Sequence, residues 1–123
     1  YISGDLNPLV ADRKIDITDI NFENDYFDFI ICNHVLEHIQ DDRKAMSELF
    51  RVLKPDGKAI LQVPVSKYNK KTLEDFSIIL PEEREKYFGQ KDHVRIYGKN
   101  YKKRLKSVGF KLDLYDVKKD FGI

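Results

Sequence analysis

The stretch FDFIICNHVLEHIQDD, residues 27–42, decides the fold because an apolar run passes directly into polar and ionisable side chains. The run FDFIIC is almost entirely apolar, which is typical of a central parallel strand covered on both faces. Asn33 and His34 end this run, and Glu37 and His38 follow closely. In open α/β sheets ligands bind beyond the carboxyl ends of the strands. Asn33 and His34 are therefore predicted to lie at a ligand-binding edge, with Glu37 and His38 near the pocket rim.

A helix and a second strand are predicted after this stretch. Asp41 or Asp42 is a suitable N-cap, and apolar residues then recur at spacings of three and four up to Leu53. The sequence KPDG, residues 54–57, is expected to end the helix. The sequence KAILQVP, residues 58–64, has the pattern of another buried strand and ends in proline. Strand, helix and strand in this order predict a parallel pair.

Weaker patterns flank this centre. They predict two short strands before it, then a long loop, two helices and a strand near a sheet edge after it. The first two strands are expected at residues 1–8 and 13–20, and the loop at 65–80. The helices are expected at 81–89 and 100–110, and the last strand at 110–117. Strands that alternate with helices indicate an α/β protein with a mostly parallel sheet, in a single domain that spans residues 1–123.

The composition excludes several classes of function. The chain has 123 residues and a net charge of +1, which gives no indication of a nucleic-acid or anionic-membrane partner. No apolar stretch reaches the roughly 18 residues of a membrane span, and the N-terminus lacks a signal-peptide pattern. The single cysteine, Cys32, excludes an internal disulfide. We expect a reduced, cytoplasmic setting.

Three segments of the chain resemble, in order and spacing, the class I S-adenosylmethionine-dependent methyltransferases. They are GDLNP (4–8), the stretch from DITDI to LQVP (16–64) and HVRIYGKNYKKRLKSVGF (93–110). The resemblance is to the branch with a HVLEHI-like turn and an RVLKPGG-like helix end. It implies a Rossmann-like sheet, S-adenosylmethionine as cofactor, and methyl transfer to an acceptor, most simply a small molecule.

The resemblance also implies which residues hold the nucleoside. Asp5, with Leu6 beside it, takes the place of the acidic residue that accepts hydrogen bonds from both ribose hydroxyls. A carboxylate suits this role because it offers two acceptor oxygens. Asp16 matches the aspartate that accepts from the adenine amino group, and Ile17 would contact the ring. Asp19 is the alternative for adenine, and a turn or a solvated strand face is the structural alternative for each aspartate.

The remaining site residues are expected around the end of the central strand. Asn33 and His34 would lie near the methionine part of the cofactor. His34, His38 and His93 are the candidates for a general base, because imidazole titrates near neutral pH. His38 is equally suited to a packing or capping role.

The acceptor site is expected in the segment 65–97, the probable acceptor-side insertion. Its sequence DHVRIYG falls where members of the family build the acceptor pocket. His93, Arg95 and Tyr97 are therefore expected to face the acceptor.

One departure from the family concerns the glycine-rich loop between its first strand and helix. The six glycines of the chain are widely spaced and form no such loop. We therefore expect the chain to begin at the family's second strand, without the first strand-helix unit. Strands left with unpaired edges pair readily with other chains, so a homodimer through exposed strand edges is also expected.

The sequence HVLEH is also H-x-x-E-H, the inverted zinc-peptidase motif. That motif needs a helix that places both histidines on one face, whereas here it directly follows a predicted strand. A third ligand would have to come from the region of Glu82, Glu83 or Glu85. We therefore expect no metal.

Two further alternatives remain open. A nicotinamide-dependent oxidoreductase would also use Asp5 to hold a ribose, although the HVLEH turn and the LKPDG helix end argue against it. The other is a non-catalytic methyltransferase-like domain that serves in binding or assembly.

Overall fold

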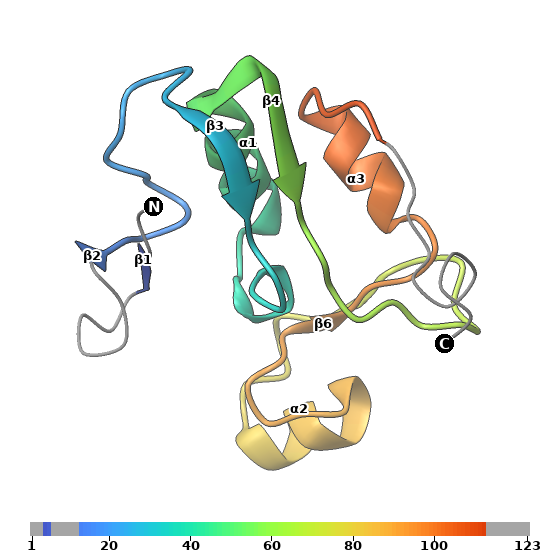
Figure 1. The fold of residues 1–123 in the computed structure, drawn as a ribbon. Helices are drawn as coiled ribbons and strands as arrows, with labels where there is room; N and C mark the ends of the chain where they lie inside the picture. The colour runs from blue at the N-terminus through green and yellow to red at the C-terminus, as the bar shows by residue number, and fades with distance from the viewer. Residues whose placement is uncertain (1–3, 6–12, 113–123) are drawn as a thin grey trace, which may run out of the picture.

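The computed structural model describes residues 4–5 and 13–112, which form an α/β arrangement (Figure 1). The elements in chain order are β1 (Gly4–Asp5), β2 (Arg13–Lys14), β3 (Phe27–Ile31), the 3-10 turn η1 (Leu36–His38), α1 (Asp42–Val52), β4 (Leu53–Ile60), β5 (Leu73–Glu74), α2 (Pro81–Phe88), β6 (Arg95–Ile96) and α3 (Tyr101–Ser107). The strand predicted at residues 110–117 lies largely outside the described residues.

The centre of the fold is the parallel pair β3–β4, joined through α1. Ile30 pairs with Ala59 and Ile31 with Ile60. The ladder continues past the strand ends, because the Cys32 amide donates to the Ile60 carbonyl at 2.8 Å. Figure 1 shows α1 against one face of this pair. The predicted strand, helix and parallel strand are confirmed.

Helix α1 forms where its sequence pattern predicts it. The Asp41 side chain accepts a hydrogen bond from the Lys44 amide at 3.1 Å, so Asp41 is the N-cap. The apolar face of α1 is buried and makes up much of the core, through Ala45, Met46, Leu49 and Val52.

Strand β4 begins earlier than expected. Phe27 pairs with Leu53, directly after α1, and pairing resumes between Phe29 and Lys58. The intervening residues 54–57 form an irregularity within the strand instead of a separate turn. The expected start at Lys58 was therefore wrong, because the chain meets its partner strand as soon as the helix ends.

The strand expected at residues 13–20 is restricted to β2, which pairs in parallel with β1. The Asp16 carboxylate accepts hydrogen bonds from the Thr18 amide at 2.9 Å and from the Thr18 hydroxyl at 2.7 Å. The Asp19 amide donates to the Asp16 carbonyl at 3.0 Å. An aspartate side chain that accepts a hydrogen bond from the backbone amide two residues later favours a turn. The chain therefore bends here.

The face of β3–β4 that α1 does not cover is exposed. Phe29 is 51% exposed, Ile31 57% and Ile60 48%. The expectation that β3 is covered on both faces is therefore wrong for the part of the chain that the structure describes. The pairs β1–β2 and β3–β4 belong to separate two-stranded sheets. The homodimer through strand edges stays a prediction.

The segment after β4 is more ordered than the loop expected at residues 65–80. β5 pairs with β6 in antiparallel fashion, and Val65 forms a parallel bridge with Tyr97. Helix α2 has proline at its start, and Gly89 ends it with a φ of 89°, as predicted. Helix α3 is held to β4's continuation by the Tyr101 hydroxyl, which donates to the Leu61 carbonyl at 2.7 Å.

Candidate functional site at the end of strand β3

The chain leaves β3 through a strained turn. His34 has a φ of 56°, in the left-handed region that non-glycine residues adopt uncommonly. Its amide donates to the Gln62 carbonyl at 2.8 Å, which keeps the turn attached to the continuation of β4. Asn33 and His34 are both exposed. The structure thus places them at the carboxyl end of the central strand, as predicted, and backbone strain of this kind is concentrated at functional sites.

Glu37, in the turn η1, is buried inside the protein and not at a pocket rim. The residue is only 2% exposed. Its backbone carbonyl accepts a hydrogen bond from the Val94 amide at 3.0 Å. Neither oxygen of its carboxylate has a hydrogen-bond partner among the described residues. The closest polar group recorded is His34, whose Nδ1 lies 3.8 Å from Oε2.

Two histidines that are distant in sequence meet beside Glu37. The rings of His38 and His93 pack edge to face with centroids 4.6 Å apart. Nδ1 of His38 lies 3.1 Å from the Asp92 carbonyl oxygen. Burial, together with the neighbouring His38, lowers the pKa of His93. One ligand atom from each of Glu37, His38 and His93 lies within 4.8 Å of the others.

Arg95 was expected to face the acceptor, and that expectation is wrong. The side chain is 0% exposed. It donates to the carbonyls of Leu36 and Gln40, each at 2.7 Å, and also to that of Ile39. Its Nε donates to Glu74 at 2.7 Å. The last carbonyls of a helical turn have no partner within the turn, and a buried guanidinium supplies donors for them.

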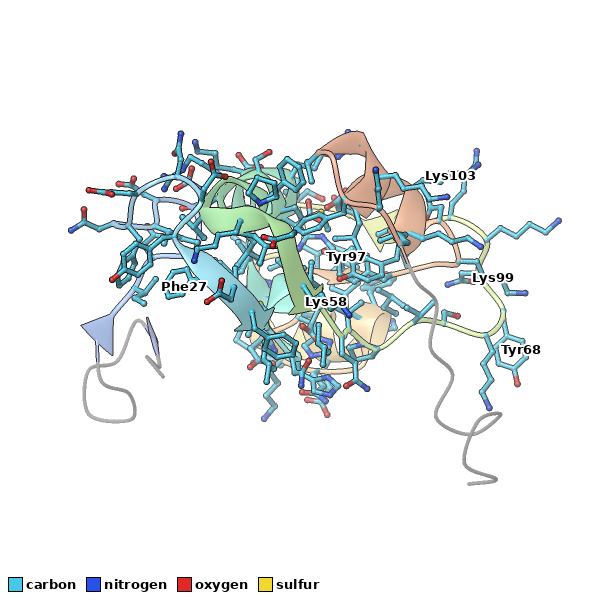
Figure 2. The ribbon with its side chains drawn as sticks, turned by 45° about the horizontal axis from the view of Figure 1, so that its top comes forward. Phe27, Lys58, Tyr68, Tyr97, Lys99 and Lys103 are labelled. Atoms are coloured by element: carbon cyan, nitrogen blue, oxygen red, sulfur yellow. The ribbon has the colours of Figure 1, made fainter. Side chains whose placement is uncertain are left out.

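Tyr97 is also interior, which contradicts the expectation that it faces the acceptor. In Figure 2 it lies among the ribbons, whereas Tyr68 projects outward. Its hydroxyl donates to Asp42, and burial together with this bond raises the pKa of Tyr97. Arg104 also donates to Asp42 at 2.7 Å and to Glu74 at 2.9 Å. No local sequence pattern links the members of this network, so it could not be predicted from the sequence.

The expected nucleoside residues are described only in part. Asp5 ends β1, and Leu6 lies outside the described residues. The exposed Asp16 carboxylate is oriented by Thr18, whose hydrogen bonds lower the pKa of Asp16. Ile17 packs against the core. An oriented, ionised and exposed carboxylate fits a ligand that offers amino or hydroxyl donors.

Comparison with known proteins finds one family similar to the central part of the chain. A family model described as a methyltransferase domain matches residues 5–61, from the end of β1 to the residue after β4. This range contains the turn after β3 and the whole β3-α1-β4 unit. This part of the chain, 57 of its 123 residues, is similar to the methyltransferase domain.

One relative and two solved structures are also similar to the chain. A ubiquinone/menaquinone biosynthesis C-methyltransferase of Vibrio parahaemolyticus is 37% identical over 59 residues, which cover 48% of this chain and 21% of that protein. The cyclase SpnF superimposes with a TM-score of 0.65 at 21% identity, covering 87% of this chain and 36% of that one. A phosphoethanolamine N-methyltransferase of Haemonchus contortus, in complex with S-adenosylhomocysteine, superimposes with a TM-score of 0.58 at 22% identity, covering 86% of this chain and 23% of that one.

These structural similarities support a class I methyltransferase fold of Rossmann-like type. At such identities they show the fold alone, and a fold does not define a reaction. The chain spans well under half the length of each of these three proteins. Among the described residues, no helix has the length and apolar character that crossing a bilayer requires.

Proposed function

We propose that the protein transfers a methyl group from S-adenosylmethionine to a small-molecule acceptor. The observation that carries this proposal is the match of residues 5–61 to the methyltransferase domain. When bound, S-adenosylmethionine supplies an electrophilic methyl group on a sulfonium sulfur. The name of the Vibrio relative supports a small-molecule acceptor.

Three positions of the chain would hold the cofactor in this proposal. Asp5, at the end of β1, would accept hydrogen bonds from the ribose hydroxyls. Asp16, beside Ile17, would accept from the adenine amino group. Asn33, with His34 next to it, would meet the methionine part at the end of β3. Each is at or after a strand end, where ligands of α/β sheets bind.

The chemical step needs alignment more than strong acid or base catalysis. A lone pair of the acceptor forms the bond to the methyl carbon while the carbon–sulfur bond breaks and its electrons remain on sulfur. Correct placement of the reacting atoms supplies much of the rate increase. An acceptor that carries a proton would lose it to water or to an imidazole. His34 is the most exposed of the three candidate bases, whereas His38 is half-buried and His93 is buried.

Calorimetric titration with S-adenosylmethionine, S-adenosylhomocysteine and NAD tests the proposal. We expect the protein to bind the first two and not NAD. Asp5→Ala should weaken S-adenosylmethionine binding by about tenfold or more, since hydrogen bonds to a charged group contribute about 1.5–3 kcal/mol. Asp28→Ala is the matched control, because this exposed aspartate lies near the opposite end of β3.

Each of the other results would overturn part of the proposal. Binding of NAD alone would indicate an oxidoreductase. Binding of none of the three compounds would favour a non-catalytic domain. If the wild type and Asp5→Ala bind S-adenosylmethionine with equal affinity, Asp5 does not hold the ribose.

A further inference from the structure

We infer that Glu37, His38 and His93 form a binding site for a divalent transition-metal ion of the zinc class. The three residues come from two segments, the turn η1 and the approach to β6, and their ligand atoms lie within 4.8 Å of one another. The inference does not rest on the proposed methyl transfer, although a bound metal would leave His34 as the free one of the three candidate bases. It also differs from the arrangement expected of an H-x-x-E-H peptidase, in which His34 and His38 would be the first two ligands, because Glu37 and His93 join His38 here.

The Glu37 carboxylate provides the first argument. The residue is 2% exposed, and both of its oxygens lack a hydrogen-bond partner among the described residues. A buried carboxylate without partners is costly unless a cation or hydrogen-bond donors compensate it. The nearby Arg95 does not serve this purpose, because its donors are directed to Glu74 and to backbone carbonyls. A bound cation would compensate the charge on both carboxylate oxygens at once.

The two imidazoles provide the second argument. Metal-bound histidines usually direct the second ring nitrogen to a carbonyl or carboxylate, which fixes the tautomer and the ring orientation. Nδ1 of His38 lies 3.1 Å from the Asp92 carbonyl oxygen and 3.4 Å from the Asp92 carboxylate. His38 therefore keeps Nε2 for a metal, and His93 places a ring nitrogen in the same cluster.

The surrounding structure holds these ligands in place. The Val94 amide donates to the Glu37 carbonyl at 3.0 Å, which ties the His93 segment directly to the turn η1. Arg95, the next residue, binds the Leu36 carbonyl on the same turn at 2.7 Å. Arg95 is thus a positioning residue for the site. A site on a fixed backbone holds its ligands more accurately than one on a free loop.

The ligand set indicates the class of metal. Two imidazoles and one carboxylate suit zinc, cobalt, nickel or iron, whereas magnesium and calcium prefer oxygen ligands alone. Three protein ligands leave at least one coordination position for water or a bound molecule. The exposed His34 lies beside the cluster, with Nδ1 3.8 Å from the Glu37 carboxylate.

The test is metal titration of the metal-free protein, with ZnCl₂ by calorimetry and CoCl₂ by visible absorption. We expect saturable binding of one ion per chain, with cobalt d–d bands that zinc displaces. Glu37→Gln and His93→Ala should each weaken zinc binding by more than the roughly 10- to 100-fold that loss of an outer-shell partner costs. Glu82→Gln, on the exposed face of α2, is the matched control and should bind zinc like the wild type.

Three results would overturn the inference. The first is that the wild type shows no saturable binding of zinc or cobalt. The second is that His93→Ala binds zinc with the affinity of the wild type. The third is that His34→Ala loses zinc binding while His93→Ala still binds zinc. Circular dichroism of each variant verifies that it is folded. If Glu37→Gln fails to fold, the zinc affinity of His93→Ala, compared with that of Glu82→Gln, decides whether the site exists. None of these measurements depends on S-adenosylmethionine.

Discussion

The guanidinium of Arg95 donates a hydrogen bond of 2.7 Å to the backbone carbonyl of Leu36, 59 positions earlier in the chain. This contact joins β6 to the turn η1 and fixes the short connection between β3 and α1. Because further bonds reach Ile39 and Gln40, one buried side chain caps most of that turn. The geometry at the end of β3 therefore depends on a residue from the second half of the chain.

Replacement of Arg95 should be strongly destabilising. Arg95→Met would leave the carboxylate of Glu74 with fewer partners and several buried carbonyls without donors. Removal of one member of a buried ion pair typically costs about 3–5 kcal/mol. Urea denaturation should show a decrease of this size in the free energy of unfolding. Arg43→Met, at an exposed position of α1, should change it by no more than about 0.5 kcal/mol. Equal stability of the two variants would contradict the structural role given to Arg95.

A second prediction concerns Gly98, which follows β6. A Cβ atom at this position would lie 2.4 Å from the backbone carbonyl carbon and oxygen of Lys71. Backbone atoms cannot move aside as the end of a flexible side chain does. Gly98→Ala should therefore destabilise the protein by about 1–3 kcal/mol or more, the usual cost of overpacking.

Thermal denaturation provides the measurement for Gly98→Ala. Lys99→Ala is the matched control, because the neighbouring side chain is exposed and its replacement adds no atoms. We expect a clearly lower Tm for Gly98→Ala than for Lys99→Ala. A Tm equal to that of the control would show that the segments around Lys71 and Gly98 are not in close contact.

The central unit could be predicted from the sequence because its signals are local. The apolar run of β3, the N-cap Asp41 and the apolar face of α1 each lie within one short window of the chain. The position of Asn33 and His34 at a strand end follows from the same windows. The strand expected at residues 13–20 ends at Lys14, because Asp16 and Thr18 form a hydrogen-bonded bend.

The interior around β6 could not be predicted because its contacts are between distant segments. Arg95 and Tyr97 looked like site residues, since charged and aromatic side chains in a loop are usually exposed. Their burial depends on Asp42 and Glu74, which are 55 and 21 positions away in the contacts observed. The proximity of His93 to Glu37 likewise requires the β6 segment to lie beside η1, and no local sequence pattern reports that.

The pH dependence of stability should include a contribution from Glu48. Hydrogen bonds from Arg51 lower the pKa of Glu48 below its ordinary value of 4.5. Both carboxylate oxygens accept from Arg51 at 2.9 Å, and Oε2 also accepts from the Ile20 amide at 2.8 Å. The folded protein thus holds Glu48 ionised more firmly than the unfolded chain does. Its contribution is present above pH 4.5 and is lost as the pH falls through the lower, folded-state pKa.

Comparison of the wild type with Glu48→Gln tests this contribution. At pH 7 the variant should be less stable by about 1–2 kcal/mol, because hydrogen bonds to an ionised group are replaced by weaker ones. The difference in the free energy of unfolding should shrink as the pH is lowered below 4.5. A gap between wild type and Glu48→Gln that stays constant with pH would contradict the role of this ion pair.

The last prediction concerns the reactivity of Cys32, which follows β3 directly. The thiol is buried, and burial together with the nearby negative charge of Glu37 raises its pKa to about 12. The thiolate is the reactive form, so an aromatic disulfide reagent should label native Cys32 very slowly at pH 8 and rapidly in urea. A bound cation at Glu37 would oppose the negative charge beside the thiol. Labelling should nevertheless stay slow with zinc, since burial is the larger cause of the raised pKa. Rapid labelling of the folded protein would show that the end of β3 opens to solvent.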